Sequence, residues 1–164
     1  MTDAPPLQNL WYLAGLSREV KPGAMLRRVL FGEPLALGRT AGGAAFALRD
    51  VCPHRAAPLS AGRVAGDAVE CPYHAWRFSA GDGRCVSVPA LPSGDKRDVS
   101  GIRVANYTLA EASGLLWIWY GAGAPTLPPP DIGLSAGLSP KTTTVVESAG
   151  PFDEAVVGLV DPAH

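Results

Sequence analysis

Short runs of apolar residues, interrupted by glycine, proline or charged residues, dominate the first 121 residues of the chain. Runs of this length bounded by turn residues are typical of short β-strands. Gly42-Gly43 and the Gly-Asp-Gly segment 81–83 stand between such runs and predict hairpin turns. We predict a mostly antiparallel β domain with strands at Trp11–Ala14, Leu26–Phe31, Pro34–Arg39, Ala44–Arg49, Ala68–Glu70, Arg77–Phe78, Cys85–Val88 and Leu115–Tyr120.

The pattern changes after residue 121. Residues 122–140 are rich in Gly, Ala, Ser and Pro, and the three prolines at 128–130 favour an extended, stiff connector. Beyond it, residues 142–146 are largely β-branched and 152–160 could begin a helix, with Pro151 at its first turn. We therefore predict a first domain over 1–121, a connector over 122–140 and the beginning of an α+β domain over 141–164, which the chain leaves incomplete.

Composition narrows the function classes. The 164 residues include 14 basic and 15 acidic side chains, for a net charge of −1, so no broad positive field favours nucleic acid or an anionic membrane. No apolar run is long enough to span a bilayer, and the first ten residues lack the basic-then-apolar order of a secretion signal. Three cysteines without such a signal favour a reducing compartment. We expect a soluble cytoplasmic protein.

Two short segments carry the strongest chemical signal. Residues 52–55 read Cys-Pro-His-Arg and residues 71–74 read Cys-Pro-Tyr-His, with sixteen residues between His54 and Cys71. Each segment supplies one thiolate and one imidazole, and together Cys52, His54, Cys71 and His74 match the ligands of a Rieske [2Fe–2S] centre. In such a centre two cysteines hold one iron and two histidines hold the other, so the pattern predicts electron transfer.

Two alternatives apply to the same residues. Structural zinc sites usually pair cysteine with cysteine and histidine with histidine, whereas each segment here carries one of each. A disulfide between Cys52 and Cys71 would leave both histidines unexplained, and it fits poorly with a reducing compartment.

Residues from about 10 to 121 resemble the Rieske domain in the catalytic α subunit of Rieske non-haem iron oxygenases, especially the phthalate-oxygenase and O-demethylase type. The resemblance rests on the segments 10–14 (Leu-Trp-Tyr-Leu-Ala), 52–55, 71–78 (Cys-Pro-Tyr-His-Ala-Trp-Arg-Phe) and 115–119 (Leu-Leu-Trp-Ile-Trp). Respiratory Rieske proteins carry an extra cysteine in each loop, where this chain has Ala57 and Tyr73. The chain therefore resembles the oxygenase and ferredoxin branch.

This resemblance implies a second metal site. In the oxygenases a mononuclear Fe(II), held by two histidines and a carboxylate, activates O₂. By resemblance His164 would be the first ligand of that iron, and Asp161 would bridge electron transfer to His74 of a neighbouring subunit. The other ligands of the family would follow His164, where this chain stops, so we expect a fragment, an incompletely represented polypeptide or a shortened protein.

The resemblance also implies partners. A ferredoxin or flavin reductase using NAD(P)H would supply electrons, and the reaction would be hydroxylation or oxidative demethylation of an organic, often aromatic, substrate. A homotrimer or another cyclic homo-oligomer would bring each cluster to the next subunit's iron. The alternative function is that of a Rieske ferredoxin, an electron carrier without oxygenase chemistry.

Further residues near the two segments have expected roles. Trp76 and Phe78 should cover the cluster and limit water, which affects its potential. Three roles are open for Arg55 and Arg77: stabilising the cluster's negative charge, facing a reductase, or acting as ordinary surface residues. Cys85 has no histidine at ligand spacing and is expected to be a buried strand residue.

Overall fold

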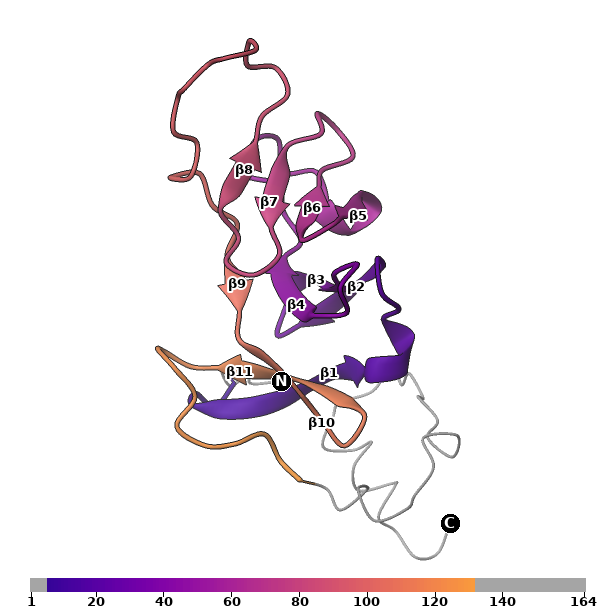
Figure 1. Cartoon of the computed structure of the whole chain (residues 1–164). Helices are drawn as coiled ribbons and strands as arrows, with labels where there is room; N and C mark the ends of the chain where they lie inside the picture. The colour runs from indigo at the N-terminus through magenta and orange to yellow at the C-terminus, as the bar shows by residue number, and fades with distance from the viewer. Residues whose placement is uncertain (1–5, 132–164) are drawn as a thin grey trace, which may run out of the picture.

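The computed structural model describes residues 6–131, which form three antiparallel sheets (Figure 1). The first sheet has the order β1 (Leu10–Leu16), β11 (Leu115–Tyr120), β10 (Leu109–Ala112). The second has the order β2 (Met25–Leu30), β3 (Glu33–Arg39), β4 (Ala45–Arg49), β9 (Asn106–Tyr107). The third has the order β5 (Arg63–Ala65), β6 (Ala68–Glu70), β7 (Arg77–Ser79), β8 (Cys85–Ser87).

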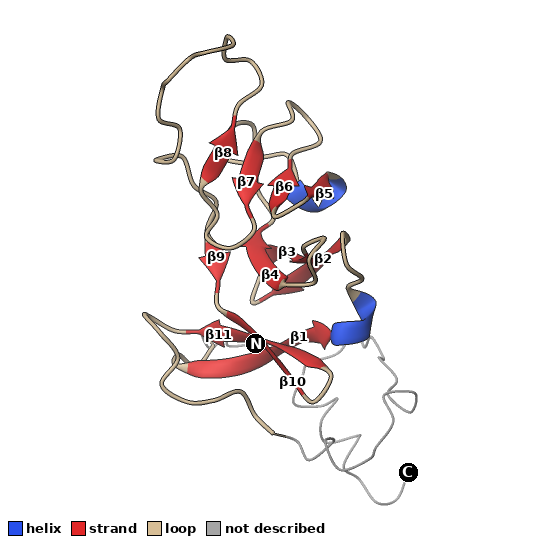
Figure 2. Cartoon of the chain, in the orientation of Figure 1, coloured by secondary structure: helices blue, strands red, loops and turns tan. Residues whose placement is uncertain are grey.

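Helical structure within the described residues is limited to two single turns, η1 (Ser17–Glu19) and η2 (Leu59–Ala61) (Figure 2). None of the helices there is long and apolar enough to cross a membrane. The mostly antiparallel β prediction is confirmed. Each predicted strand overlaps an observed one, and the predicted turns at 42–43 and 81–83 join β3 to β4 and β7 to β8.

The second sheet lies between the other two and is buried on both faces (Figure 1). Along β3, Leu35 and Leu37 pack with Ile118 of the first sheet, whereas Ala36, on the opposite face, packs in the cluster that holds both Cys52 and Cys71. Strand residues alternate between faces, so one strand contributes to two cores. The two segments singled out by sequence therefore rest on the largest of these cores.

The third sheet carries the second segment. Residues 71–76 connect β6 to β7 and lie at the end of this sheet that faces away from the first sheet (Figure 1). Residues 51–58 connect β4 to η2. The hydrogen-bonded strands hold the ends of both connections, so the loops between them have fixed entry and exit points.

Candidate metal centre

The first loop is closed by its own backbone. The N–H of Cys52 donates to the carbonyl of Ala57 at 2.9 Å, and the N–H of Ala56 donates to the carbonyl of Cys52 at 2.8 Å. Ala56 has a φ of 54°, a left-handed conformation that is unfavourable for alanine by about 1 kcal/mol. The strained residue lets the chain turn back, and His54 projects from the tip of the resulting loop.

The second loop repeats the same frame. The N–H of Cys71 donates to the carbonyl of Trp76 at 2.9 Å, and the N–H of Ala75 donates to the carbonyl of Cys71 at 3.1 Å. Ala75 has a φ of 53°. Because both loops make these bonds at the same offsets from their cysteines, each presents its cysteine at the base and its histidine nearer the tip.

The four candidate ligands come together in two pairs. Cys52 and Cys71 are 2% and 3% exposed and belong to one core cluster. His54 and His74 are exposed, with ring centroids 4.7 Å apart and planes inclined by 58°. The structure thus brings the two thiols together inside and the two imidazoles together at the surface.

Local electrostatics act on these groups before any metal is bound. Burial raises the pKa of the Cys52 thiol; hydrogen bonds from the backbone N–H groups of His54 and Arg55 lower it, and the nearby Cys71 thiol raises it. Desolvation lowers the pKa of His54, and the positive charges of His74 and Arg55 lower it further. The N–H groups directed at Cys52 would stabilise a thiolate, the form that binds metal.

The arrangement fits a two-iron cluster. Across residues 6–131, no group of three or more His, Cys, Asp or Glu side chains gathers as a site for a single ion. A Rieske cluster instead needs two protein ligands at each of two irons, and the paired thiols and paired imidazoles supply them. All three cysteines are free thiols, so the alternative Cys52–Cys71 disulfide is not formed.

Aromatic rings support the histidines. The Trp76 indole stacks on the His54 ring with centroids 4.6 Å apart and planes within 6°. The Tyr73 ring contacts His74 at 3.9 Å between centroids but is 63% exposed. Phe78 is fully buried in the core cluster that contains both candidate cysteines. Trp76 and Phe78 therefore lie close to the candidate ligands, and their role in limiting water stays a prediction.

Two residues outside the loops were missed by sequence reasoning. Glu70, immediately before Cys71, lies between Arg63 and Arg77 and accepts a hydrogen bond from each Nε at 2.7 Å. Asp50, two residues before Cys52, is buried at the other loop. An acidic residue just ahead of each Cys-Pro pair was the available signal.

The structure places some of the other residues singled out by sequence, whereas two of them lie outside the described part of the chain. Arg77 is occupied by its ion pair with Glu70, and Arg55 is exposed beside His54. Cys85 is buried, as expected, and its thiol lies 3.7 Å from the carbonyl of Ser87. Asp161 and His164 lie outside the described residues.

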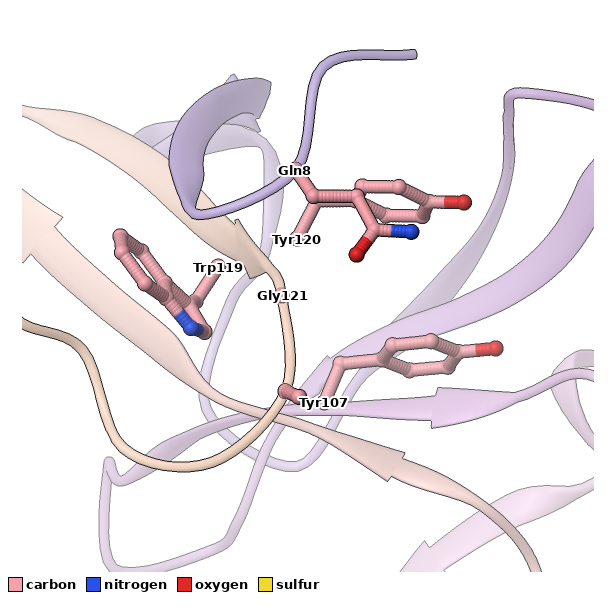
Figure 3. A pocket seen from close by; sticks show the side chains of 6 residues that line it. Gln8, Tyr107, Trp119, Tyr120 and Gly121 are labelled. Carbon is pink, nitrogen blue, oxygen red and sulfur yellow. The ribbon is translucent and has the colours of Figure 1, made fainter. Parts of the chain in front are cut away.

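A pocket of about 330 Å³ lies elsewhere, at the end of β11 (Figure 3). Burial raises the pKa of Tyr107, one of the residues that line this pocket. The candidate ligands contribute nothing to its wall, which is formed by Gln8, Tyr107, Trp119, Tyr120, Gly121 and Ala122. The candidate metal centre is therefore built on surface loops rather than in this pocket.

Comparison with known proteins gives relatives that include oxygenase components. The chain is 39% identical over 117 residues to the oxygenase component of dicamba O-demethylase from Stenotrophomonas maltophilia, which covers 70% of this chain and 32% of that protein. It is 43% identical over 115 residues to the oxygenase component of chloroacetanilide N-alkylformylase from Rhizorhabdus wittichii, covering 70% and 31%. The chain thus spans about a third of the length of these relatives.

Solved structures agree. Dicamba monooxygenase bound to dicamba superposes with a TM-score of 0.68 at 37% identity, over 82% of this chain and 40% of that one. The terminal oxygenase of carbazole 1,9a-dioxygenase from Nocardioides aromaticivorans gives 0.65 at 28% identity, over 82% and 35%. The family profile described as the Rieske [2Fe-2S] domain matches residues 10–108, which include both loops. The chain therefore belongs to the Rieske [2Fe-2S] domain family.

Proposed function

We propose that Cys52 and Cys71 hold one iron of a [2Fe–2S] cluster and that His54 and His74 hold the other. The observation that supports this most is the repeated loop frame, which pairs two buried thiols with two exposed imidazoles. When bound, the cluster supplies reversible one-electron transfer.

Different residues of the chain would shield the cluster, orient its ligands and leave one side open to a partner. The core that buries both cysteines keeps water from the sulfur ligands. The Trp76 ring covers one face of His54 and holds its orientation. Exposure of both histidines leaves the imidazole side open to a redox partner, so electrons would enter and leave there.

We propose further that the whole protein is the terminal oxygenase component of a Rieske oxygenase system. Both curated relatives described above are oxygenase components. Electrons from a reductase using NAD(P)H would pass through the cluster to a mononuclear Fe(II), whose first ligand would be His164. Asp161 would bridge this site to His74 of a neighbouring subunit, in a cyclic homo-oligomer. The reaction would be hydroxylation or oxidative demethylation of an organic substrate.

A ferredoxin is a reasonable electron donor. Among the structural neighbours, the oxygenase of carbazole 1,9a-dioxygenase is described in a reduced complex with a ferredoxin, at 28% identity and a TM-score of 0.64. The exposed imidazoles here offer a surface for such a partner. We expect the protein to work in the cytoplasm, where NAD(P)H is available.

An electron carrier is the second candidate. The family match ends at residue 108, so the matched region by itself requires nothing more than electron transfer. The content of iron and acid-labile sulfide in anaerobically purified natural protein separates the two functions. Three irons to two sulfides would support the oxygenase, whereas two to two would support the carrier.

The ligand assignment has its own test. Cys52→Ser should abolish the cluster's absorbance and its electron paramagnetic resonance (EPR) signal. Cys85→Ser is the matched control, because Cys85 is equally buried but is not a proposed ligand, and it should retain both signals. Bound zinc with no sulfide in the wild-type protein, or full sulfide content in Cys52→Ser, would contradict the assignment.

A further inference from the structure

Asp50 is a buried carboxylate whose role the fold alone does not explain. The residue is 2% exposed and lies immediately after β4. Its Oδ1 accepts the backbone N–H of Ser60 at 2.6 Å, and its Oδ2 accepts the Ser60 hydroxyl, also at 2.6 Å. The nearest cation is Arg27, whose Nε lies 3.8 Å from Oδ2, beyond hydrogen-bond distance, on a side chain that is 60% exposed. Burial of a charged group is costly, so such a residue requires specific partners.

These contacts close the first ligand loop. Asp50 precedes Cys52 by two residues, and Ser60 follows His54 in η2, so the Asp50–Ser60 pair ties the two ends of the loop together. Two residues span at most about 7 Å of chain, so the Cα atoms of Asp50 and Cys52 lie within that distance of each other. The pair therefore constrains the loop that carries both Cys52 and His54.

The second loop has a different anchor. Glu70 precedes Cys71, and its two oxygens each accept an arginine Nε at 2.7 Å, from Arg63 and Arg77. The negative charge of Glu70 is thus neutralised by two close cations. Asp50 instead accepts both of its close hydrogen bonds from an uncharged serine, and the nearest cation among the described residues is the Arg27 guanidinium, 3.8 Å away on a side chain that is 60% exposed.

We propose that Asp50 is a positioning residue for the cluster and that its buried charge lowers the cluster's reduction potential. This inference rests on the proposed ligand set. A nearby negative charge disfavours addition of an electron, and it acts strongly where water does not screen it. The hydroxyl of Ser60 partly compensates that charge. Asp50 and Ser60 therefore act on the potential in opposite directions.

The experiment measures the midpoint potential of the cluster by redox titration of the intact protein, with the EPR spectrum of the reduced state. Asp50→Asn removes the charge and should shift the potential to more positive values. Ser60→Ala removes one hydrogen bond from the carboxylate and should shift it to more negative values. Ser60→Thr restores a hydroxyl and should return it toward the wild-type value.

Glu111→Gln is the matched control for the loss of one carboxylate. Glu111 pairs with Arg39 at 2.9 Å and lies on β10, in the sheet at the opposite end from the loops (Figure 1). The midpoint potential of the cluster in Glu111→Gln should equal that of the wild-type protein. If the cluster does not assemble in Asp50→Asn, the midpoint potential of Ser60→Ala still tests the proposal, because that variant keeps the carboxylate of Asp50.

The outcomes separate this inference from the proposed function. Opposite shifts in Asp50→Asn and Ser60→Ala support it. Shifts in the same direction, or potentials equal to that of Glu111→Gln, would overturn it while leaving the cluster assignment intact. A wild-type protein without a [2Fe–2S] signal would overturn both.

Discussion

Gly62 is a position in the described structure where even the smallest side chain, a methyl group, should be strongly destabilising. It follows η2 and precedes β5, and its N–H donates to the carbonyl of Leu59 at 2.8 Å. A Cβ at Gly62 would lie 2.0 Å from the carbonyl oxygen of Glu70 and 3.1 Å from that of Leu59. Both obstacles are backbone atoms, so no side-chain rotation relieves the contact.

The cost of Gly62→Ala can be worked from these distances. The Glu70 carbonyl must retreat by about 1.4 Å to reach an ordinary contact of 3.4 Å. Overpacking of this kind typically costs 1–3 kcal/mol, and a rigid backbone obstacle places it at about 3 kcal/mol. That is a large part of the 5–15 kcal/mol that stabilises a typical domain. The same carbonyl is bonded to Cys71 through one peptide unit, so the second ligand loop must move with it.

Gly66→Ala is the matched control in the β5–β6 turn. Gly66 has a φ of +65°, but a Cβ there meets no atom within 4 Å, so only the left-handed conformation is penalised, by about 1 kcal/mol. Denaturant unfolding followed by tryptophan fluorescence, together with iron and sulfide content, compares the two variants. The free energy of unfolding should fall by about 2 kcal/mol more in Gly62→Ala than in Gly66→Ala, and Gly62→Ala should contain less iron and sulfide. Equal stability and full cluster content in both would refute the reasoning.

Three more predictions follow from single contacts. Trp76→Leu removes the ring stacked on His54 and should cost about 1 kcal/mol and broaden the cluster's EPR lines; an unchanged spectrum would contradict the orienting role. Phe78→Ala empties a fully buried site and should cost about 4 kcal/mol by denaturant unfolding, whereas a loss below about 1 kcal/mol would show that the core collapses into the gap. The backbone N–H of Leu16 lowers the pKa of Glu19, so Glu19 stabilises the fold above its unfolded pKa of 4.5, and that contribution is lost as pH falls through the folded value. Glu19→Gln should therefore cost about 1 kcal/mol at neutral pH and progressively less as pH falls below 4.5, and a difference independent of pH would exclude this linkage.

The sequence predicted the strands whose apolar runs are long or bounded by clear turn residues. Leu115–Tyr120 and Pro34–Arg39 are of this kind, and both lie in the centres of sheets. Strands β5, β9 and β10 were not predicted. They have two to four residues each; β5 and β10 pair with the strand that follows them across a short turn, whereas β9 pairs with the distant β4. In a segment of two to four residues, the alternation of apolar and polar positions and the residue composition do not identify a strand.

The candidate ligands could be predicted because cluster chemistry fixes both their types and their spacing. Their anchors could not, because nothing in the sequence shows that Asp50 meets Ser60, or that Glu70 stands opposite both Arg63 and Arg77. Each pairing is produced by strand register or by the path of a turn. An acid ahead of each loop was visible in the sequence, but its burial was not.

The two loops share a backbone frame and differ in charge, and this difference bears on how such a site works. The shared frame, with left-handed Ala56 and Ala75, fixes where the cysteines and histidines point. This frame fixes the geometry of each loop, and because it is the same in both loops it does not distinguish one from the other. The acidic anchors do distinguish the loops, since Glu70 accepts from two arginines at 2.7 Å whereas the nearest described cation to Asp50, Arg27, lies 3.8 Å away. The backbone bonds of the frame include neither carboxylate, so on the proposed role of Asp50 the loss of its charge should change the potential more than the path of the loop.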